Sequence, residues 1–186
     1  MINLIKKIVG KIAYLKRKIA VFYWRKDFSV NEGPDHKLLF YKEIESINNL
    51  SLSHLTEEQK EMYQQRFFNN NLCCVIENEG VVAAYGWVNT NNHHYLGELD
   101  LMMNVGNGIE VLYDFYTDVD YRGQGLYPYL LKKICLRNNK SKLIYAFAEN
   151  NSSIKGIKKA NFRYLGNLRG INKINYKYLI KKICKE

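Results

Sequence analysis

Metal-type cysteine spacings and long uninterrupted apolar runs are both missing from this 186-residue chain. Its four cysteines, Cys73, Cys74, Cys135 and Cys184, have no metal-site spacing, and this usage fits a reduced, cytoplasmic protein best. Lysines interrupt every early apolar stretch that is long enough for a secretory signal or a membrane span. The three-glycine dinucleotide fingerprint and the Gly-Lys-Ser/Thr of a P-loop are absent too. The sequence therefore gives no reason to expect a secreted, membrane-spanning, Rossmann or P-loop protein.

The composition is that of a folded protein. Apolar residues make up 47% of the chain and aromatic residues 13%, so one sizeable core can form and disorder is not expected. The length favours a single domain.

Acidic residues are absent from residues 1–26, which carry eight of the net ten positive charges. Apolar residues recur there every three or four positions and predict a basic amphipathic helix, an arm before the domain: Ile2, Ile5, Ile8, Ile12, Leu15, Ile19 and Phe22. Such a helix can lie on an anionic membrane surface, or it can pack on its own domain or on a second subunit of a homodimer. We expect no nucleic-acid partner, because no nucleic-acid-binding motif accompanies the charge.

The remaining chain alternates between two periodicities. Residues 27–37 are expected to be a linker. Strands are predicted at 38–41, 72–77, 81–90, 95–103, 109–117, 142–149, 162–168 and 174–180, and helices at 56–69, 126–138 and from 150. Short turns predict an antiparallel meander, whereas the helix at 126–138 makes the strands on either side of it parallel. The prediction is an α+β fold with a mixed, mostly antiparallel sheet of six to seven strands flanked by helices.

A glycine turn joins the strand at 109–117 to the helix at 126–138. The first N–H groups of a helix have no intrahelical partner, and the helix dipole adds positive charge, so this junction suits a phosphate or diphosphate. Gly123 and Gly125 allow close approach of the backbone to a ligand, and Arg122 adds a formal charge.

The segment Arg122-Gly-Gln-Gly-Leu-Tyr127 resembles motif A of the GNAT acyltransferases, with Tyr127 where that family has Gly or Ala. A second segment supports the resemblance: an apolar strand at 144–149, a helix started by Asn150, and Asn161-Phe162 at the family's spacing. The order of elements from about residue 37 to 183 is similar to that of a GNAT domain.

The resemblance implies roles for individual residues. Backbone groups of Tyr116, Thr117, Asp118 and Val119 would meet the pantetheine arm of acetyl-CoA, with Asn150 and Ser153 along the same arm. The diphosphate would be held by Arg122, Gly123, Gln124, Gly125, Leu126 and Tyr127. The family's general-acid tyrosine has no equivalent, because its position is Ile157.

Candidate catalytic groups lie on the strands that lead to this turn. A base for the attacking amine is expected among Glu98, Asp100, Glu110 and Asp114, while Tyr113 and Tyr145 can shape the acceptor pocket. His93 and His94 have the composition of a surface loop, and without a third ligand at suitable spacing we predict no metal site.

The resemblance implies an acetyl-CoA-dependent N-acetyltransferase that transfers its acetyl group directly to a small-molecule amine. An amino-sugar in surface polysaccharide biosynthesis is the first candidate acceptor. The alternative is a GNAT-fold module that binds acyl-CoA without catalysis and serves protein or membrane interaction. A cytoplasmic location is expected, with the inner face of the membrane as an option through residues 1–26.

Overall fold

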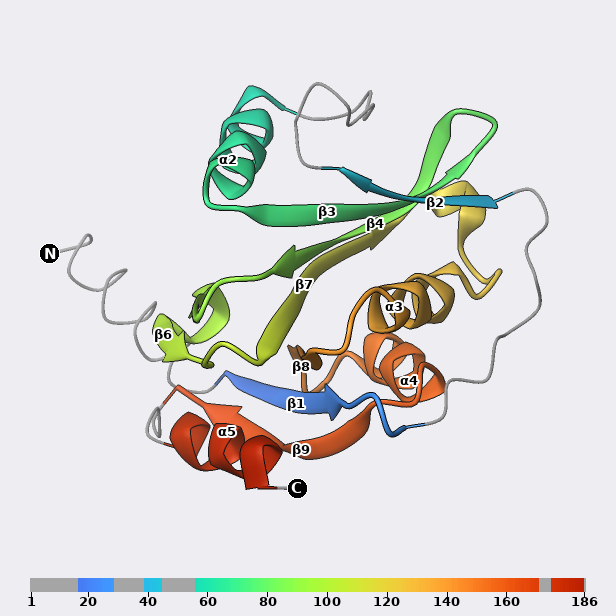
Figure 1. Cartoon of the computed structure of the whole chain (residues 1–186). Helices are drawn as coiled ribbons and strands as arrows, with labels where there is room; N and C mark the ends of the chain where they lie inside the picture. Colours follow the sequence, from blue (N-terminus) through green and yellow to red (C-terminus); the bar gives the residue numbers. More distant parts are fainter. Residues whose placement is uncertain (1–16, 29–38, 45–55, 171–174, 186) are drawn as a thin grey trace, which may run out of the picture.

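The computed structural model describes residues 17–28, 39–44, 56–170 and 175–185 (Figure 1). Its strands are β1 (Lys18–Trp24), β2 (Leu39–Ile44), β3 (Asn71–Asn78), β4 (Val81–Asn89), β5 (His93–Leu96), β6 (Leu101–Asn104), β7 (Ile109–Thr117), β8 (Ser141–Phe147) and β9 (Arg163–Arg169). The helices are α2 (Glu57–Phe68), α3 (Leu126–Leu136), α4 (Asn151–Lys159) and α5 (Asn175–Lys185), with short 3₁₀ turns η2 (Gly97–Leu99) and η3 (Val119–Tyr121).

Seven strands form one mixed sheet in the order β2-β3-β4-β7-β8-β1-β9, and β5 and β6 form a separate hairpin. Every neighbouring pair in the large sheet is antiparallel except β7 and β8, which α3 connects. The predicted α+β class and the parallel pair are therefore confirmed.

The prediction of one helix through Phe22 is wrong from Lys18 onward. Residues 18–24 are strand β1, which pairs with β8 on one side and β9 on the other. Ile19 to Trp24 are all buried, so this run has core on both sides, as an interior strand requires. β1 belongs to the sheet, and the proposed arm of residues 1–26 does not extend as far as its expected end; residues 1–16 lie outside the described part.

Two further predictions need correction. The single strand expected at 95–103 is a hairpin, because η2 interrupts it and Asp100 takes a left-handed φ of 46°. The strand expected at 174–180 is helix α5 from Asn175 onward. Tyr176, Leu179, Ile180 and Ile183 recur at helical spacing and pack on the core, which explains the helix.

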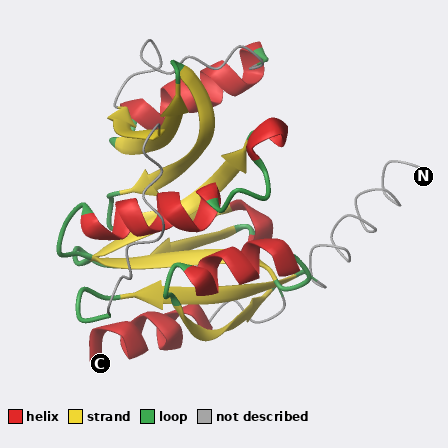
Figure 2. Cartoon of the chain, turned by 90° about the vertical axis from the view of Figure 1, so that its right-hand side faces the viewer, coloured by secondary structure: helices red, strands yellow, loops and turns green. Residues whose placement is uncertain are grey.

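Helices cover both faces of the large sheet. α3 and α4 lie side by side on one face, where α3 contacts β3, β4 and β7 and α4 contacts β8 (Figures 1 and 2). α2 packs on the other face through Tyr63, and α5 packs against β9 and β6. No helix in the described ranges is both long and apolar enough to cross a membrane.

The two parallel strands part midway. Their pairing runs from Ile109 opposite Ser141 to Leu112 opposite Ile144 and goes no further. Beyond Leu112, β7 carries a bulge against β4, and Asp114 takes a φ of 51°. The second half of β7 therefore leaves β8 and runs toward the glycine turn.

Candidate functional site

The glycine turn has the backbone geometry that its sequence predicts. Gly123 and Gly125 have φ values of 79° and 81°, and Gly125 is the N-cap of α3. A Cβ at either position would meet no atom within 4 Å, so this side of the backbone faces open space. No side chain caps the helix, which leaves its first N–H groups available to an anion. Arg122 Nε donates to the Thr117 carbonyl at 3.1 Å, which ties the turn to the end of β7.

A cavity of about 510 Å³ opens beside this turn. The end of β7, the glycine turn with the start of α3, and one side of α4 form its walls. Eight of the predicted coenzyme-contacting residues line it: Tyr116, Thr117, Arg122, Gly123, Gly125, Leu126, Tyr127 and Ser153. The cavity thus brings together the two sequence segments that carry the family resemblance.

The other four predicted coenzyme residues lie outside the cavity lining, and three of them hold turns together. Asp118 Oδ1 accepts from the Asp120 N–H at 3.0 Å, and Gln124 Nε2 donates to the Asp120 carbonyl at 3.2 Å. Asn150 caps α4, accepting from the Ser153 N–H at 3.1 Å. Val119 is exposed.

Sequence reasoning missed two cations of the lining, Lys155 and Lys159. Both lie on α4 on the same side as Ser152 and Gly156, at spacings of three and four residues, so the helical period after Asn150 could have located them. With Arg122 they place three positive charges around the glycine turn. This charge, the free helix N-terminus and the open glycines suit a diphosphate.

Aromatic rings form the inner wall of the cavity. Tyr127 stacks edge-on against Phe115, with ring centroids 5.3 Å apart. Each ring occupies the space that a side chain would need at a glycine: Phe115 lies over Gly86, and Tyr127 lies over Gly156. Burial raises the pKa of Tyr127, so its hydroxyl is neutral at physiological pH.

On the opposite sheet face, Arg66 and Asp114 form an ion pair beside the β7 bulge. Their Nη1 and Oδ2 atoms are 2.5 Å apart. The guanidinium lies about 5 Å from the ring centroids of Tyr63, Trp87 and Tyr113. Asp114, a predicted base, is partly exposed, yet Arg66 holds its carboxylate. Tyr113 donates to Asn71 Oδ1 at 3.2 Å and contributes a ring to this surface.

His94 is buried, contrary to the surface-loop expectation, which fits only its exposed neighbour His93. His94 Nε2 lies 3.0 Å from the Tyr145 hydroxyl, and Nδ1 lies 3.1 Å from Asn89 Nδ2. Burial, together with the charge of Arg66, lowers the pKa of His94 to about 4. Tyr145 follows Ile144, the last residue of β8 that pairs with β7, so this polar chain ends where the parallel strands part.

The remaining predicted bases lie in different places. Glu98 is in η2, and its charge helps to raise the pKa of Tyr145, after the larger effect of burial. Asp100 is exposed and accepts from the Tyr95 hydroxyl at 3.0 Å.

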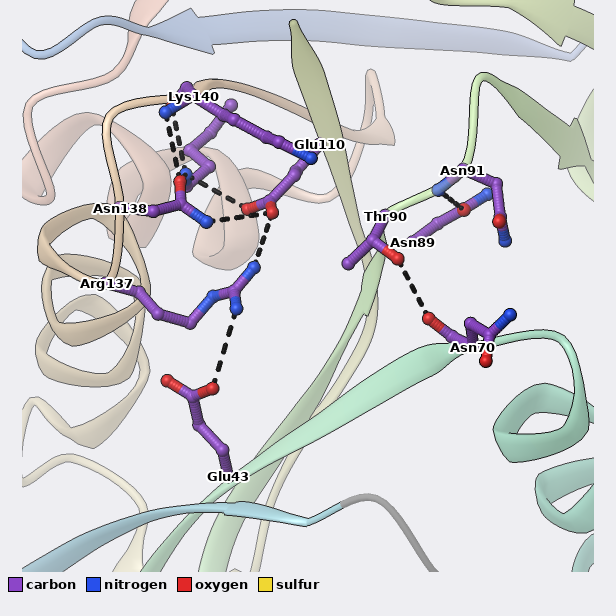
Figure 3. Close-up of polar contacts among 10 residues, drawn as sticks. Glu43, Asn70, Asn89, Thr90, Asn91, Glu110, Arg137, Asn138 and Lys140 are labelled. Atoms are coloured by element: carbon purple, nitrogen blue, oxygen red, sulfur yellow. Dashed lines mark hydrogen bonds and ion pairs between the residues drawn. The ribbon is translucent and has the colours of Figure 1, made fainter. Parts of the chain in front are cut away.

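Glu110 lies at the opposite end of β7 from the glycine turn, seven residues or about 23 Å of strand from Thr117. It is buried and accepts from Arg137 Nη2 and from Asn138 (Figure 3). Its other oxygen is 3.0 Å from Lys142 Nζ. Burial alone would raise the pKa of Glu110, but Lys142, Asn138 and Arg137 hold it below its usual value. The position and the ion pairs indicate a structural role.

Comparisons with known proteins agree with this geometry. Similar solved structures include a putative GNAT acetyltransferase from Novosphingobium aromaticivorans (TM-score 0.53, 16% identity, 81% of this chain and 61% of that one). A GCN5-related N-acetyltransferase from Sphaerobacter thermophilus is also similar (TM-score 0.55, 12% identity, 82% of this chain and 50% of that one). So is a GCN5-related N-acetyltransferase-like protein from Streptococcus suis (TM-score 0.52, 15% identity, 87% of this chain and 64% of that one). At these identities the likeness shows the fold, and this chain spans less than two thirds of each of the three.

No curated protein sequence matches the chain. The sequence profile of the Acetyltransferase (GNAT) family, however, matches residues 41–162, which include β7, the glycine turn, α3, β8 and α4. This match covers well over half of the chain, so the protein belongs to the GNAT acetyltransferase family.

Proposed function

We propose that this protein is an N-acetyltransferase that takes the acetyl group of acetyl-CoA and transfers it directly to a small-molecule amine. The observation that carries the proposal is the cavity at the glycine turn, with its open N–H groups and three cations. A diphosphate is the group of acetyl-CoA that this chemistry suits.

The described residues can support direct transfer by binding and orientation. With the diphosphate at the glycine turn, the arm of the coenzyme would run along the second half of β7, whose backbone no longer pairs with β8. An amine placed at the opening between the strands would then meet the thioester in a fixed geometry. Glu98 and Asp114 remain the candidate bases, since the charges of both act on Tyr145, where β7 and β8 part.

An amino-sugar, carried on a nucleotide or a lipid in surface polysaccharide synthesis, is our first candidate acceptor. The partly buried rings of Tyr113 and Tyr116 lie on the sheet face opposite α3, and such rings suit a sugar ring. A panel of amino-sugars, polyamines, aminoglycosides and peptide amines, assayed by release of CoA thiol, tests this choice.

Calorimetry with acetyl-CoA tests the coenzyme site. Gly125→Val should abolish binding, because a side chain would enter the space that the diphosphate needs and would strain a residue at φ 81°. Gly106→Val is the matched control: Gly106 has a φ of 78° and equally open surroundings, but it lies in the loop before β7, away from the cavity. Equal affinity in the two variants would contradict the proposed site.

Two observations keep a non-catalytic acyl-CoA-binding module as the alternative. Ile157, which stands at the family's acid position, is fully buried in the core, and Tyr127 fills space that the family leaves to Gly or Ala. Binding of acetyl-CoA without turnover across the acceptor panel would favour this alternative.

Membrane association is a separate proposal. Five of the eight cations in residues 1–26 precede β1, in or next to the segment outside the described residues. If that segment binds an anionic membrane surface, the protein should sediment with phosphatidylserine vesicles at low salt and should be released from them at high salt. Equal sedimentation with neutral vesicles would contradict this proposal.

A further inference from the structure

A chain of hydrogen bonds links Asn89, His94 and Tyr145 outside the coenzyme cavity. It begins at the Asn91 backbone N–H, which donates to Asn89 Oδ1 at 2.8 Å (Figure 3). A backbone N–H can only donate, so this bond fixes which end of the Asn89 amide is oxygen. Asn89 Nδ2 then faces the His93 carbonyl at 2.8 Å and His94 Nδ1 at 3.1 Å.

The Asn89 amide determines where His94 carries its proton. An amide nitrogen only donates, so His94 Nδ1 must accept. The ring is neutral near pH 7, because its lowered pKa of about 4 lies well below that pH. A neutral imidazole that accepts at Nδ1 has its hydrogen on Nε2. His94 therefore donates to the Tyr145 hydroxyl oxygen across 3.0 Å.

This arrangement turns the Tyr145 hydrogen away from His94. Within the described ranges, His94 is the hydrogen-bond partner of this hydroxyl, and it does not accept. Tyr145 is the first residue of β8 beyond the last parallel pair, Leu112 opposite Ile144, and it is partly exposed. Its hydroxyl can thus donate to a ligand that enters the opening between β7 and β8.

We propose that Tyr145 donates a hydrogen bond from its hydroxyl to the sulfur of the acyl thioester, and that His94 and Asn89 are positioning residues that aim it. The proposal rests on the function proposed above. From the diphosphate site, the arm of the coenzyme has to pass from Thr117 to Tyr113, four residues or about 13 Å of strand, to bring its sulfur to this opening. Ile157 cannot do this work, since its apolar side chain is buried.

The proton balance of the step is simple. The acceptor nitrogen bonds to the thioester carbonyl carbon, and the carbon–sulfur bond breaks with its electron pair on sulfur. The Tyr145 O–H stabilises the departing sulfur by a charge-assisted hydrogen bond and keeps its proton, because burial and nearby charges raise the pKa of Tyr145 above that of a thiol. The proton lost by the acceptor nitrogen passes through water to the sulfur, so amine and thioester give amide and thiol.

Charged and titratable groups near Tyr145 also affect the pKa of its hydroxyl. The titratable or charged groups that face it come from β5, η2, β7 and α2: His94, Glu98, Tyr113, Asp114 and Arg66. Among them, His94 is the one that donates a hydrogen bond to the phenol oxygen.

CoA itself is the probe for the first test, because it needs no acceptor. We expect the thiol of bound CoA, followed by thiolate absorbance, to ionise about one pKa unit lower in the wild type than in Tyr145→Phe, a tenfold change. His94→Phe should behave like Tyr145→Phe, whereas His94→Gln, which keeps an N–H donor, should stay near the wild type. His93→Gln is the control on the exposed neighbour. Equal thiol pKa values in the wild type and Tyr145→Phe, with CoA bound to both, would overturn the assignment and leave the proposed function standing.

Two further measurements complete the test. Nitrogen-15 spectra of the ligand-free protein should show the His94 proton on Nε2, and a proton on Nδ1 would overturn the positioning role. With an acceptor in hand, Tyr145→Phe should lower kcat roughly a hundredfold, as loss of a hydrogen-bond donor to the developing negative charge does, with little change in KM for acetyl-CoA. An unchanged kcat would overturn the proposal. A complete lack of CoA binding, detected by the calorimetry above, would instead overturn the proposed function.

Discussion

The ring of Tyr127 lies directly on Gly156: a Cβ at residue 156 would overlap the Tyr127 Cδ1 atom and come within 2.8 Å of Cε1. The two residues come from α3 and α4, the helices on either side of the coenzyme cavity. The bulky residue that replaces the family's Gly or Ala is thus accommodated by a glycine on the facing helix. The pair sets the shape of the inner wall.

Gly156→Ala should destabilise the protein. Overpacking costs about 1–3 kcal/mol, and the better helix propensity of alanine offsets at most about 1 kcal/mol, so we expect a net loss on the order of 1 kcal/mol. In a Tyr127→Ala background the same change should be neutral or stabilising. Urea unfolding of the four proteins of this cycle measures the coupling. An equal cost in both backgrounds would show that the two residues do not share this space.

Local features of the site could be predicted from the sequence, and pairings across elements could not. Gly123 and Gly125 indicate the turn because a positive φ favours glycine, and glycine can be recognised in the sequence itself. The fit of Tyr127 on Gly156 depends on how α3 packs on α4, which no local pattern reports. Likewise, nothing near His94 in the sequence indicates that Tyr145, 51 residues later, is its partner.

The fold was predictable where one periodicity dominated. The predicted helix is wrong over β1 because Ile19 and Phe22 continue the helical spacing of the preceding residues. The unbroken apolar run from Ile19 to Trp24 was the better signal, since a strand buried on both faces needs no alternation. The strand predicted at 174–180 is wrong because the buried face of α5 follows a four-residue spacing, with Leu179 and Ile183 buried and Tyr178 exposed.

Removing residues 1–25 should prevent stable folding. β1 is the strand that joins β9 to β8, so its loss exposes both partners and leaves β9 without a neighbour in the sheet. Deleting only residues 1–16 keeps the whole of β1 and serves as the matched control. Circular dichroism and thermal melts compare the two. A soluble protein lacking residues 1–25 with a wild-type melting temperature would contradict the central place of β1.

Glu110→Gln should cost stability and leave the chemistry intact. The substitution removes the negative charge between Lys142 and Arg137, and an uncompensated buried charge costs about 3–5 kcal/mol. Glu43→Gln is the control, because its carboxylate lies 3.5 Å from Arg137 but is 32% exposed, and such pairs contribute less than about 1 kcal/mol. Denaturant unfolding gives the stabilities, and kcat under folding conditions gives the chemistry. A large loss of kcat in the folded Glu110→Gln protein would restore Glu110 as a catalytic candidate.

Acid should destabilise the wild-type protein through His94. In the unfolded chain this histidine takes up a proton below its ordinary pKa of about 6.5, whereas in the folded protein burial and Arg66 delay protonation until about pH 4. Between these values the unfolded state binds more protons, so stability falls as the pH is lowered through this window and this contribution levels off below it. The full effect is on the order of 3 kcal/mol. His94→Gln lacks this pH-dependent contribution to stability, and His93→Gln retains it. Urea unfolding from pH 7 to pH 4 should therefore show the stability of the wild type falling relative to that of His94→Gln. The wild-type and His93→Gln stabilities should run parallel. If the His94→Gln and wild-type curves ran parallel instead, His94 would not be held neutral by its surroundings, and the orientation inferred for the Tyr145 hydrogen would lose its basis.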